Sequence, residues 1–522
     1  MTKSVGIDLG TTYSCVVHYS SDGTETVIPT PSGTELTPSI VHISDRGDVT
    51  VGEEAKHLAR TDPDNVIVGI KRHMGRDHIL EFAGATLTPE GISALLLSRL
   101  ADDAATTLGV PREQLQAVIT VPAYFGVAEK EATATAARIA GIDCSELLAE
   151  PVAAAYAYGL ALETEKTSLI YDLGGGTFDV AVVGIDGGQH RVWAVDGESR
   201  LGGLDWDARI QDLLWDEVAA LDDGEELRFE EAVVAAIESA SEKIKRKLTG
   251  AHVVTERVRL QGRNIELRIS REKFEEVTSD LLLRTSAATD RVISAAHEVG
   301  APSVDQIVLV GGSTRMPMIR KMLATRYSLP VMLTDPDRAV ARGASILAEQ
   351  LLAKQQQRAI TIGGIRSMGA CSPRITSVIP RSIGVLVHTS HDPYFEEPYV
   401  LHFVPANTPL PVQDLAFNVA TIVKNQDRVR VRLYEQAGNK ASPSIADNRP
   451  LIEAELSGLP DGPAGSRITL QLTISDDGRI RLQASAGRRQ LPVAIESFMH
   501  GVLDDAETTA QQATTRHLRM LR

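Results

Sequence analysis

The sequence predicts a mixed α/β domain of two related lobes, followed by an antiparallel β-sandwich and a short C-terminal helix. Three observations support this prediction. A pattern of apolar strand, Asp-Leu-Gly, small-residue turn and second strand occurs at residues 5–17 and again at residues 168–183. Strands and helices alternate up to residue 353, which is typical of α/β layers. Short alternating strands separated by turn signals follow from about residue 375, which favours a sandwich.

The size and charge of the chain restrict its class. Its 522 residues are too many for one compact core and indicate several folding units. The formal net charge is −16, with 43% hydrophobic residues. This negative charge argues against a nucleic-acid partner or an anionic membrane surface. It leaves room for a nucleotide, because a small cradle with a metal can hold phosphates inside an acidic protein.

The cysteines and the N-terminus favour a cytoplasmic protein. Cys15, Cys144 and Cys371 lie far apart and none has CxxC spacing, which argues against a zinc site or a disulfide framework. The N-terminus enters a strand almost at once, without an apolar signal region. No stretch approaches the length of a membrane-spanning helix, so we expect no membrane contact.

The elements that precede the second copy of the strand–turn–strand pattern, at residues 168–183, are predicted from local patterns. Residues 5–9 form a short apolar strand, and a second strand begins at residue 15 after a tight turn. Residues 90–108 have helical spacing. Residues 117–122 read as a buried strand closed by a proline, and residues 128–139 as an Ala-rich helix that ends at Gly141.

The second half of the α/β domain repeats this order. After the copy at residues 168–183 we expect helices near 205–221 and 229–248, a strand pair near 253–269 and a helix from 271 to about 299. Another apolar strand at residues 306–310 runs into a Gly-Gly-Ser turn. The sequence therefore predicts a domain boundary at residue 353.

The character of the chain changes beyond this boundary. Residues 354–377 are polar and then rich in small residues, and we assign them to a linker. Residues 378–492 are assigned to the β-sandwich, with turn signals at Gly438-Asn439, Pro460-Asp461-Gly462 and Asp476-Asp477-Gly478. Residues 493–522 are polar, and we expect them to form a short helical tail.

The two glycine-rich turns suggest a phosphate site. Small residues between two strands let backbone N–H groups converge on an anion. We therefore expect the turns at residues 10–12 and 174–177 to face each other as phosphate loops. Asp8 and Asp172 stand at the strand ends beside them, which suits Mg²⁺, a hard ion that binds a few carboxylates and keeps most of its waters. A GxxxxGK[ST] motif is absent, which disfavours a P-loop NTPase.

The complete set of motifs is closer to one family. It resembles the Hsp70/DnaK chaperones, in the family's order across residues 3 to about 352. The matching segments are residues 6–12, 70–72, 118–125, 150–156, 172–179, 201–203 and 311–317. Sugar kinases and actins share the fold and its loops but not this set. The resemblance implies an actin-like two-lobed ATPase domain with ATP and Mg²⁺ as cofactors.

The resemblance also implies roles for individual residues. Lys71 would be the catalytic lysine, since a cation there stabilises charge on the γ-phosphate and orients the attacking water. Glu150 and Asp179 would position that water or the metal shell, with Thr177 beside them, while Asp8 and Asp172 would hold Mg²⁺ through water. The phosphate-binding set would be Gly10, Thr11, Thr12, Tyr13, Gly174, Gly175, Gly176 and Thr177, with the loop glycines Gly202 and Gly203.

The adenosine side would come from two further segments. Glu242, Lys245, Arg246 and Thr249 recur at i, i+3, i+4 and i+7 and share one helical face. They match the family's adenosine-binding helix, with Thr249 in place of the usual serine. Gly311, Gly312, Ser313 and Arg315 would close the other side of the adenine, with Asp337 nearby.

Each of these assignments has a simpler alternative. Lys71 alone reads as a solvated surface lysine, and the helical face from Glu242 to Thr249 reads as an exposed charged face. Asp337 suits a helix N-terminus as well as a ligand. Leu201-Gly202-Gly203 is short enough to mark only a loop, and Cys15 reads as a buried small side chain.

Several segments depart from the family. Lys130 replaces the usual Arg that, with Pro122, relays nucleotide state, and Gly126-Val127 replaces an Asn-Asp pair. Glu146 and Ala149 stand where bacterial members carry the Arg and Asn that bind J-domain cochaperones, so an ordinary J-domain partner is not expected. Residues 76–90 are short for the family, which indicates a trimmed subdomain. The linker lacks the family's leucine run, which puts coupling between the two domains in doubt.

The sandwich also resembles the family, whose substrate domain binds extended polypeptide through main-chain hydrogen bonds and a central pocket. Candidate groove residues are His402, Phe403 and the segment 416–418, although such aromatics also suit a sandwich core. The lid is reduced to a single helix at residues 493–522, which predicts fast release of peptide.

The leading interpretation is an ATP-dependent Hsp70-like chaperone whose partners are unfolded or extended polypeptide and a nucleotide-exchange factor. The alternative is an ATPase scaffold that binds one dedicated protein through its sandwich. A small-molecule kinase on the same fold is the third reading, and the sandwich counts against it.

Overall fold

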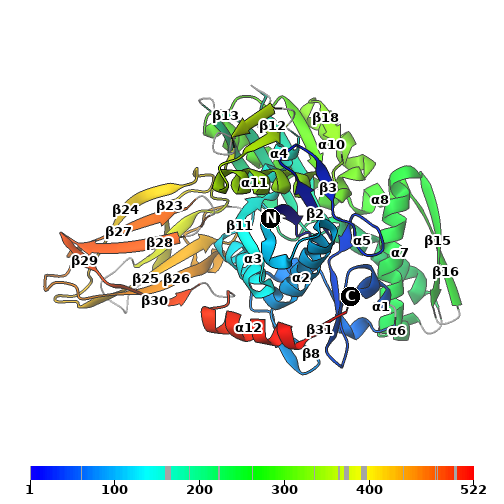
Figure 1. Ribbon diagram of the computed structural model, residues 1–522, viewed down its shortest axis with the longest axis horizontal. Coiled ribbons are helices and arrows are strands. Elements are labelled where there is room, and N and C mark those ends of the chain that lie inside the picture. Colours follow the sequence, from blue (N-terminus) through cyan, green and yellow to red (C-terminus); the bar gives the residue numbers. More distant parts are fainter. Residues whose placement is uncertain are drawn as a thin grey trace.

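The computed structural model describes residues 2–59, 61–158, 166–186, 189–221, 224–260, 263–333, 335–362, 365–368, 375–388, 397–438, 440–475, 478, 480–498 and 502–521. Cys371 and the turn residues Asn439, Asp476 and Asp477 lie outside these ranges. Two α/β lobes form one body, and the β-sandwich projects from its side (Figure 1). The termini both lie in the α/β body.

Lobe I is built on a mixed sheet whose central strand, β1, carries the first glycine-rich turn at its end. β1 pairs in parallel with β10 and antiparallel with β2. The spatial order of the sheet is β11 (Asp143–Ala149), β10 (Leu115–Val121), β1 (Lys3–Asp8), β2 (Tyr13–Tyr19) and β3 (Glu25–Val27), with β4 (Thr37–Pro38) paired to β2.

Lobe II repeats this arrangement. Its central strand β12 pairs in parallel with β17 and antiparallel with β13. The spatial order is β18 (Val331–Leu333), β17 (Gln306–Val310), β12 (Ser168–Leu173), β13 (Phe178–Asp186), β14 (Gln189–Glu198) and β21 (Ile375–Thr376). The first five strands therefore match β11-β10-β1-β2-β3 one for one, which is the internal similarity that the two sequence copies predict.

Two helices connect the lobes. α11 (Ala339–Gln355) packs on β1, β2 and β10 of lobe I, and α4 (Glu150–Ala157) packs on β12 and β13 of lobe II. The two helices approach so closely that a Cβ on Gly343 would lie 1.6 Å from the carbonyl oxygen of Ala153. Only glycine at position 343 allows this contact, which fixes the spacing of the lobes on either side of the site.

The remaining elements cover the two sheets. Those of lobe I are β5 (Ile40–Ile43), β6 (Asp48–Val51), α1 (Glu53–Leu58), η1 (Pro63–Asn65), β7 (Val66–Val68), η2 (Ile70–His73), β8 (Leu80–Phe82), β9 (Ala85–Leu87), α2 (Pro89–Leu108), η3 (Arg112–Gln114) and α3 (Val127–Ala140). Those of lobe II are α5 (Gly203–Ala219), α6 (Gly224–Leu227), α7 (Glu231–Gly250), β15 (Val253–Leu260), β16 (Arg263–Ser270), α8 (Arg271–Val277), α9 (Ser279–Glu298), η4 (Gly312–Arg315) and α10 (Pro317–Tyr327).

The sandwich consists of two antiparallel sheets around an aliphatic core that includes Ile383, Leu433 and Leu470. One sheet has the order β23 (Pro398–Val404), β22 (Ile383–His388), β25 (Arg428–Gln436), β26 (Asn448–Ser457) and β30 (Val493–Phe498). The other has the order β24 (Val412–Ala420), β27 (Arg467–Ile474), β28 (Ile480–Ala486) and β29 (Arg489–Leu491), and η6 (Ile445–Asp447) precedes β26.

The segment expected to be a linker, residues 354–377, contains regular structure. α11 continues to Gln355, and β19 (Ala359–Ile362) pairs antiparallel with β20 (Ile365–Met368). β21 then joins the lobe II sheet beside β14. These pairings could not be predicted from the sequence, because the strands are short and consist largely of polar and small residues. In addition, β21 pairs with a strand that is distant in the chain.

The expectation of a helical tail over residues 493–522 is wrong at its start. Residues 493–498 form β30, which pairs with β26, so the sandwich extends past the expected boundary at residue 492. The helix itself, α12 (Asp505–His517), is present, with Asp504 as its N-cap and Glu507 completing a capping box. It packs on α2 and α3 of lobe I, and β31 (Arg519–Met520) pairs with β6.

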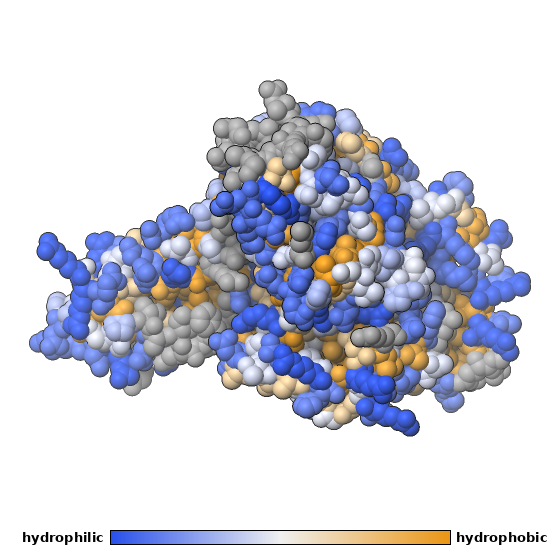
Figure 2. Space-filling model, in the orientation of Figure 1, coloured by the Kyte–Doolittle hydropathy of each residue, from blue (hydrophilic) through white to orange (hydrophobic). Residues whose placement is uncertain are grey.

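The surface is predominantly polar. On the face drawn in Figure 2, hydrophilic residues dominate and the apolar residues form separate small patches. In the part of the chain that the structure describes, the helices are all too short or too polar to cross a membrane.

Candidate active site between the lobes

The two glycine-rich turns face each other across the space between the lobes. A Cβ on Gly175 would lie 1.7 Å from Oγ1 of Thr12, and one on Gly176 would lie 2.3 Å from Cγ2 of Thr11. The turn at residues 10–13 is equally tight, because a Cβ on Gly10 would lie 2.0 Å from the carbonyl oxygen of Tyr13. Larger side chains would fill this space, so the glycines keep open a cradle lined by backbone.

Lys71 and Glu150 form a buried ion pair close to Asp8 and Asp172, the aspartates that precede the two turns. The Nζ of Lys71 donates a hydrogen bond of 2.6 Å to Oε1 of Glu150, and both side chains are less than a tenth exposed. Lys71 comes from η2 of lobe I and Glu150 from the start of α4. A lysine held in a water-poor site beside a carboxylate has the charge and reach expected of a catalytic cation, and it is not a solvated surface lysine.

Three further carboxylates lie around this pair. Burial, followed by the negative charge of Glu150, raises the pKa of Asp8 to about 7. The same two causes raise the pKa of Asp179 to about 7, and they raise the pKa of Asp172 well above its usual range. Four carboxylates, of which Glu150, Asp172 and Asp179 are buried, therefore lie near Lys71. Such an excess of negative charge is stabilised by a cation that joins the group.

The donor set fits a magnesium ion held mainly through water. Within the described ranges, no three Asp, Glu, His or Cys side chains converge closely enough to ligate a metal by themselves. Asp8 and Asp172 stand at the ends of the equivalent strands β1 and β12, and Asp8 accepts a hydrogen bond of 3.2 Å from Thr120. Mg²⁺ commonly binds through few protein carboxylates, several waters and substrate phosphates.

One polar atom of the cradle lacks a protein partner. The hydroxyl of Thr12 is buried and makes no hydrogen bond with any residue that the structure describes. A buried hydroxyl without a partner costs free energy, so it is usually satisfied by water or a ligand. Thr177, which is also buried, closes the opposite turn, where the Gly174 N–H donates to its carbonyl at 3.1 Å.

Three of the four candidate adenosine residues of α7 contact other candidate residues or loops of the site. Lys245 reaches into the site and donates to the carbonyl of Gly203 at 2.9 Å and to Asp207 at 2.6 Å. Glu242 lies beside Tyr13, whose hydroxyl donates to it at 3.2 Å. Arg246 is largely exposed and lies over the Tyr13 ring, 6.0 Å from its centre.

Thr249 lies one turn further along α7, near the end of the helix, where its carbonyl accepts a hydrogen bond from Arg271. Glu242, Lys245 and Arg246 therefore meet other candidate residues of the site, whereas the hydrogen-bond partner of Thr249, Arg271, is not one of the candidate residues. The sequence spacing alone places all four on one face and does not separate them.

The loop at residues 311–315 meets the same region. A Cβ on Gly203 would lie 2.5 Å from Oγ of Ser313 and 2.9 Å from Nζ of Lys245, so three separate segments converge at this point. Ser313 also donates to the carbonyl of Gly174 at 2.8 Å. Arg315 pairs with Asp337 at 2.5 Å.

The other glycines of the site lie so close to neighbouring atoms that a larger residue would not fit there. A Cβ on Gly311 would lie 2.6 Å from Oδ1 of Asp172, and one on Gly312 would lie 2.9 Å from Asp337. Gly202 packs against the backbone of Gly175 and Gly176 in the same way.

Sequence analysis missed several residues that hold the site together. Arg72 donates to the carbonyl of Gly176 at 2.9 Å and pairs with Asp205 at 2.8 Å, which joins lobe I to lobe II. Lys56 of α1 pairs with Glu242 at 3.0 Å and makes a second link. Arg72 and Thr120 stand inside recognised motifs and could have been named. No sequence signal marks Lys56, because its partner is distant in the chain.

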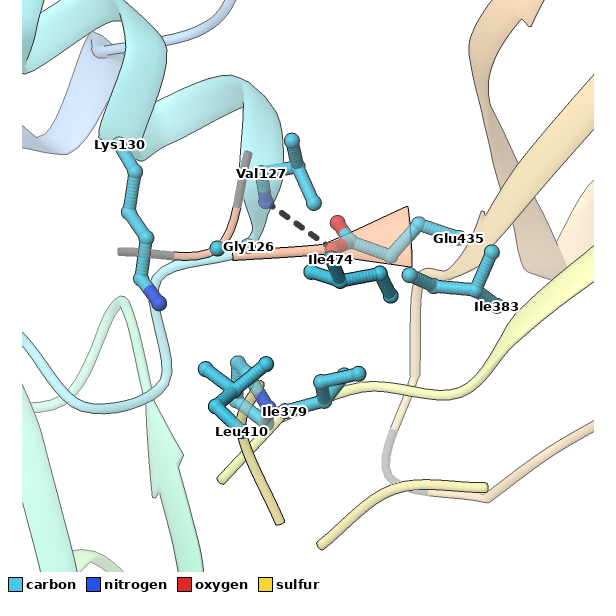
Figure 3. A pocket seen from close by; sticks show the side chains of 10 residues that line it. Gly126, Val127, Lys130, Ile379, Ile383, Leu410, Glu435 and Ile474 are labelled. Carbon is cyan, nitrogen blue, oxygen red and sulfur yellow. Dashed lines mark hydrogen bonds between the residues drawn. The ribbon is translucent and has the colours of Figure 1, made fainter. Parts of the chain in front are cut away.

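The site also contacts the sandwich through the loop after β10. Figure 3 shows the interface beside this loop, where the Val127 N–H donates to Oε1 of Glu435 at 3.1 Å. A Cβ on Gly126 would lie 2.1 Å from the other oxygen of Glu435. Lys130, expected to relay nucleotide state, lines the same pocket together with Ile379 and Leu410 of the sandwich.

Behind this pocket lies a buried charge network. Arg381 of the sandwich is almost completely buried and lies 3.4 Å from Glu129 and 3.3 Å from Glu435. Arg449 pairs with Glu129 at 2.6 Å. Burial opposes the ionisation of Glu129, but Arg381 and Arg449 lower its pKa. Paired and buried charges of this kind hold two surfaces in one specific arrangement.

The candidate groove residues of the sandwich lie at its edge. Phe403 of β23 and Phe417 of β24 stack across the two sheets with ring centres 4.1 Å apart, and both are half-buried against the core. His402 bonds to Asn448 at 2.9 Å, and Asn418 accepts from Thr469 at 3.0 Å. The aromatics therefore contribute to the sandwich core, as the simpler reading expects.

Comparison with known families agrees with this geometry. The sequence matches the family model described as "Hsp70 protein" over residues 4–82 and 77–515, which is nearly the whole chain. The two matched segments overlap at residues 77–82, inside the segment 76–90 that is expected to be short for the family. Together with the paired lobes and the cradle between them, this match shows that the chain belongs to the Hsp70 family.

Proposed function

We propose that this protein is an ATP-dependent chaperone that binds and hydrolyses ATP between its lobes and binds extended polypeptide in its β-sandwich. The observation that supports it best is the buried Lys71–Glu150 pair, which lies near Asp8, Asp172 and Asp179 at the two facing glycine-rich turns. This set suits in-line attack of water on a terminal phosphate.

Each part of the site would have a separate task. The turns at residues 10–13 and 174–177 would hold the phosphates through backbone N–H groups and the free hydroxyl of Thr12. Lys71 would stabilise charge on the transferred phosphate, and Glu150 holds the lysine in place. Glu242, Lys245 and Arg246 would border the adenosine.

Asp8 and Asp172 would hold Mg²⁺ through water, and the bound ion would neutralise phosphate charge. The raised pKa values of these two carboxyls are consistent with a place for a cation that the protein itself does not supply.

The position of α12 favours a second candidate, an ATPase scaffold that binds one dedicated partner. α12 packs on lobe I and not over the sandwich, so it is not in a position to cover a bound peptide there. Such a sandwich would retain a general peptide weakly, whereas a partner with a larger interface would not depend on a lid.

The test is single-turnover ATP hydrolysis with and without a short apolar peptide, on wild type, Lys71→Ala and the control Lys273→Ala. Lys273 is an exposed lysine that pairs with Glu276 on its own helix. We expect Lys71→Ala to slow hydrolysis by at least about 100-fold, and Lys273→Ala to leave it unchanged.

The peptide arm separates the two candidates. Stimulation by many apolar peptides supports the chaperone, whereas hydrolysis that depends on Lys71 but ignores peptide supports the scaffold. Hydrolysis at the wild-type rate in Lys71→Ala would contradict both.

A further inference from the structure

The sandwich is tied to the α/β body at both of its ends, and to a different lobe at each end. On its N-terminal side, β21 pairs with β14 of lobe II, and Asn407 accepts a hydrogen bond of 2.9 Å from the Val195 N–H. On its C-terminal side, β30 is followed by residues 502–521, which lie on lobe I (Figure 1). We call residues 502–521 the C-terminal strap.

The strap is fastened by backbone pairing. The Arg519 N–H donates to the carbonyl of Gly47 at 2.9 Å, and the Leu521 N–H donates to that of Val49 at 2.8 Å. These bonds make β31 a parallel partner of β6 and extend the β7-β5-β6 sheet by one strand. The edge of β6 is thereby covered by a segment of the same chain.

Side chains of the strap also hold it on lobe I. Leu503, Leu518 and Met520 pack on the apolar core of lobe I. Gln511 donates to the carbonyl of Thr86 at 3.0 Å, and Gln512 donates to that of Arg138 at 2.9 Å. These contacts lie along the whole length of α12, so the strap is integrated into lobe I and does not rest on one exposed ion pair.

The connection between sandwich and strap is short. β30 ends at Phe498 and α12 begins at Asp505, so the seven Cα–Cα steps between them span at most roughly 25 Å when fully extended. While the strap is docked, β30 cannot move further than this from lobe I. We infer that the C-terminal strap is a cis tether, which keeps the sandwich close to the interface formed by Gly126, Val127 and Arg381 when that interface opens.

This inference goes beyond the proposed function, since it concerns how far the domains separate and does not require ATP hydrolysis. A second connection raises the effective concentration of one interface surface at the other. Lengthening a flexible connection lowers this effective concentration by about threefold for each doubling of its length. Inserting about 18 Gly and Ser residues after position 500 lengthens the six residues between β30 and α12 to about 24, which is two doublings.

The test is hydrogen exchange of two groups of amides in full-length protein. The Val127 N–H reports on the domain interface through its bond to Glu435, and the Arg519 and Leu521 N–H groups report on the strap. We expect the insertion to speed exchange at Val127 by about eightfold and to leave Arg519 and Leu521 unchanged. The same insertion after Ser32, in an exposed turn of lobe I, is the matched control and should change neither group.

Three results would overturn the inference. If the insertion after position 500 leaves hydrogen exchange at Val127 unchanged, the strap does not restrain the sandwich. Unprotected Arg519 and Leu521 amides in the unmodified protein would show that the strap is not docked. A dimer of unmodified protein in light scattering, with the strap amides protected only in the dimer, would show that the strap docks on a second copy.

Discussion

Tyr124 donates its backbone N–H to Oδ1 of Asp179 at 2.9 Å, so the loop that meets the sandwich is hydrogen-bonded directly to a carboxylate of the candidate active site. The hydroxyl of the same tyrosine donates to the carbonyl of Gly438 in the sandwich at 3.1 Å, and Arg381 lies over its ring at 4.4 Å. One residue therefore contacts both the site and the sandwich, and a shift at Asp179 can move the interface without an intervening helix.

Replacing Tyr124 with Phe should weaken the domain interface without disturbing the site. The variant keeps the ring and the backbone N–H that binds Asp179, and loses the hydroxyl with its hydrogen bonds to Gly438 and Arg381. We expect a loss of about 1 kcal/mol, seen as about fivefold faster hydrogen exchange at the Val127 amide. Unchanged ATP affinity is the internal control, and a large change in affinity would show that the hydroxyl also serves the site.

Replacing Arg381 with Met should strongly destabilise the interface. Glu435 would remain buried without the guanidinium that lies 3.3 Å from it, since Arg449 pairs with Glu129. Breaking a buried ion pair on one side costs on the order of 3 kcal/mol, which thermal unfolding would detect. Arg381→Met combined with Glu435→Gln should recover part of the loss, because Gln still accepts from Val127. A double variant no more stable than the single one would refute this account.

Gly126→Ala should also open the interface. The added methyl would lie 2.1 Å from a carboxylate oxygen of Glu435, a side chain that is buried and held by Arg381 and the Val127 N–H. We expect a loss of 1–3 kcal/mol, roughly the cost of overpacking. Gly250→Ala is the matched control, because a Cβ there meets no atom within 4 Å. Equal unfolding temperatures for the two variants would argue against the predicted contact.

Thr12→Val should reduce ATP affinity without reducing the stability of the nucleotide-free protein. The Thr12 hydroxyl is buried without a partner, so its removal costs the free protein no hydrogen bond. We expect affinity in equilibrium dialysis to fall by about tenfold. In the control Thr278→Val, the lost hydroxyl donates to Phe274 at 2.7 Å, so stability should fall by about 1 kcal/mol with affinity unchanged. Unaltered affinity in Thr12→Val would remove this hydroxyl from the phosphate site.

Docking of the strap should weaken as pH rises from about 4.5 to about 7. Burial raises the pKa of Glu90 to about 7, with further contributions from Glu507 of the strap and from Asp77, while a hydrogen bond from Thr88 opposes the shift. Release of the strap would expose Glu90 and return its pKa towards the usual value. Between pH 4.5 and pH 7 the docked state therefore binds more protons than the released state. The stability of docking falls as the pH rises through this range, and the contribution of Glu90 is lost above pH 7.

The measurement is the protection factor of the Arg519 and Leu521 amides, corrected for the intrinsic exchange rate, at pH 5.5 and pH 8. We expect protection to fall by about tenfold or more across this range in wild type. The fall should be absent in Glu90→Gln, which keeps the shape without the charge. Asp505→Asn, which changes a carboxylate that is almost fully exposed, should behave like wild type. A pH dependence retained in Glu90→Gln would assign the effect to another group.

Much of the site could be predicted because its chemistry is local in sequence. Gly10 to Thr12 and Gly174 to Thr177 each form one turn, and a turn of successive small residues lets backbone N–H groups converge on an anion. The repeat of apolar strand and Asp-Leu-Gly turn also predicted that the two lobes are related, and the matching strand orders bear this out. Lys71 was recognisable only inside the full motif set, because a lone lysine has no distinguishing context.

The domain interface was not predictable in the same way. Arg381, Glu129 and Glu435 are ordinary charged residues in three separate segments, and their burial depends on how the sandwich docks. The strand β31 covers two residues, too few for any periodic pattern, and it exists because the edge of β6 is available to it.

The sequence by itself therefore determined the two-lobed fold, the family and the two glycine-rich turns, since each depends on residues close together in the chain. Only the tertiary structure decided that residues 493–498 belong to the sandwich, that α12 lies on lobe I, and that a buried charge network joins the domains. These features depend on contacts between distant segments, whose free energy comes from surfaces that meet only after each domain has folded.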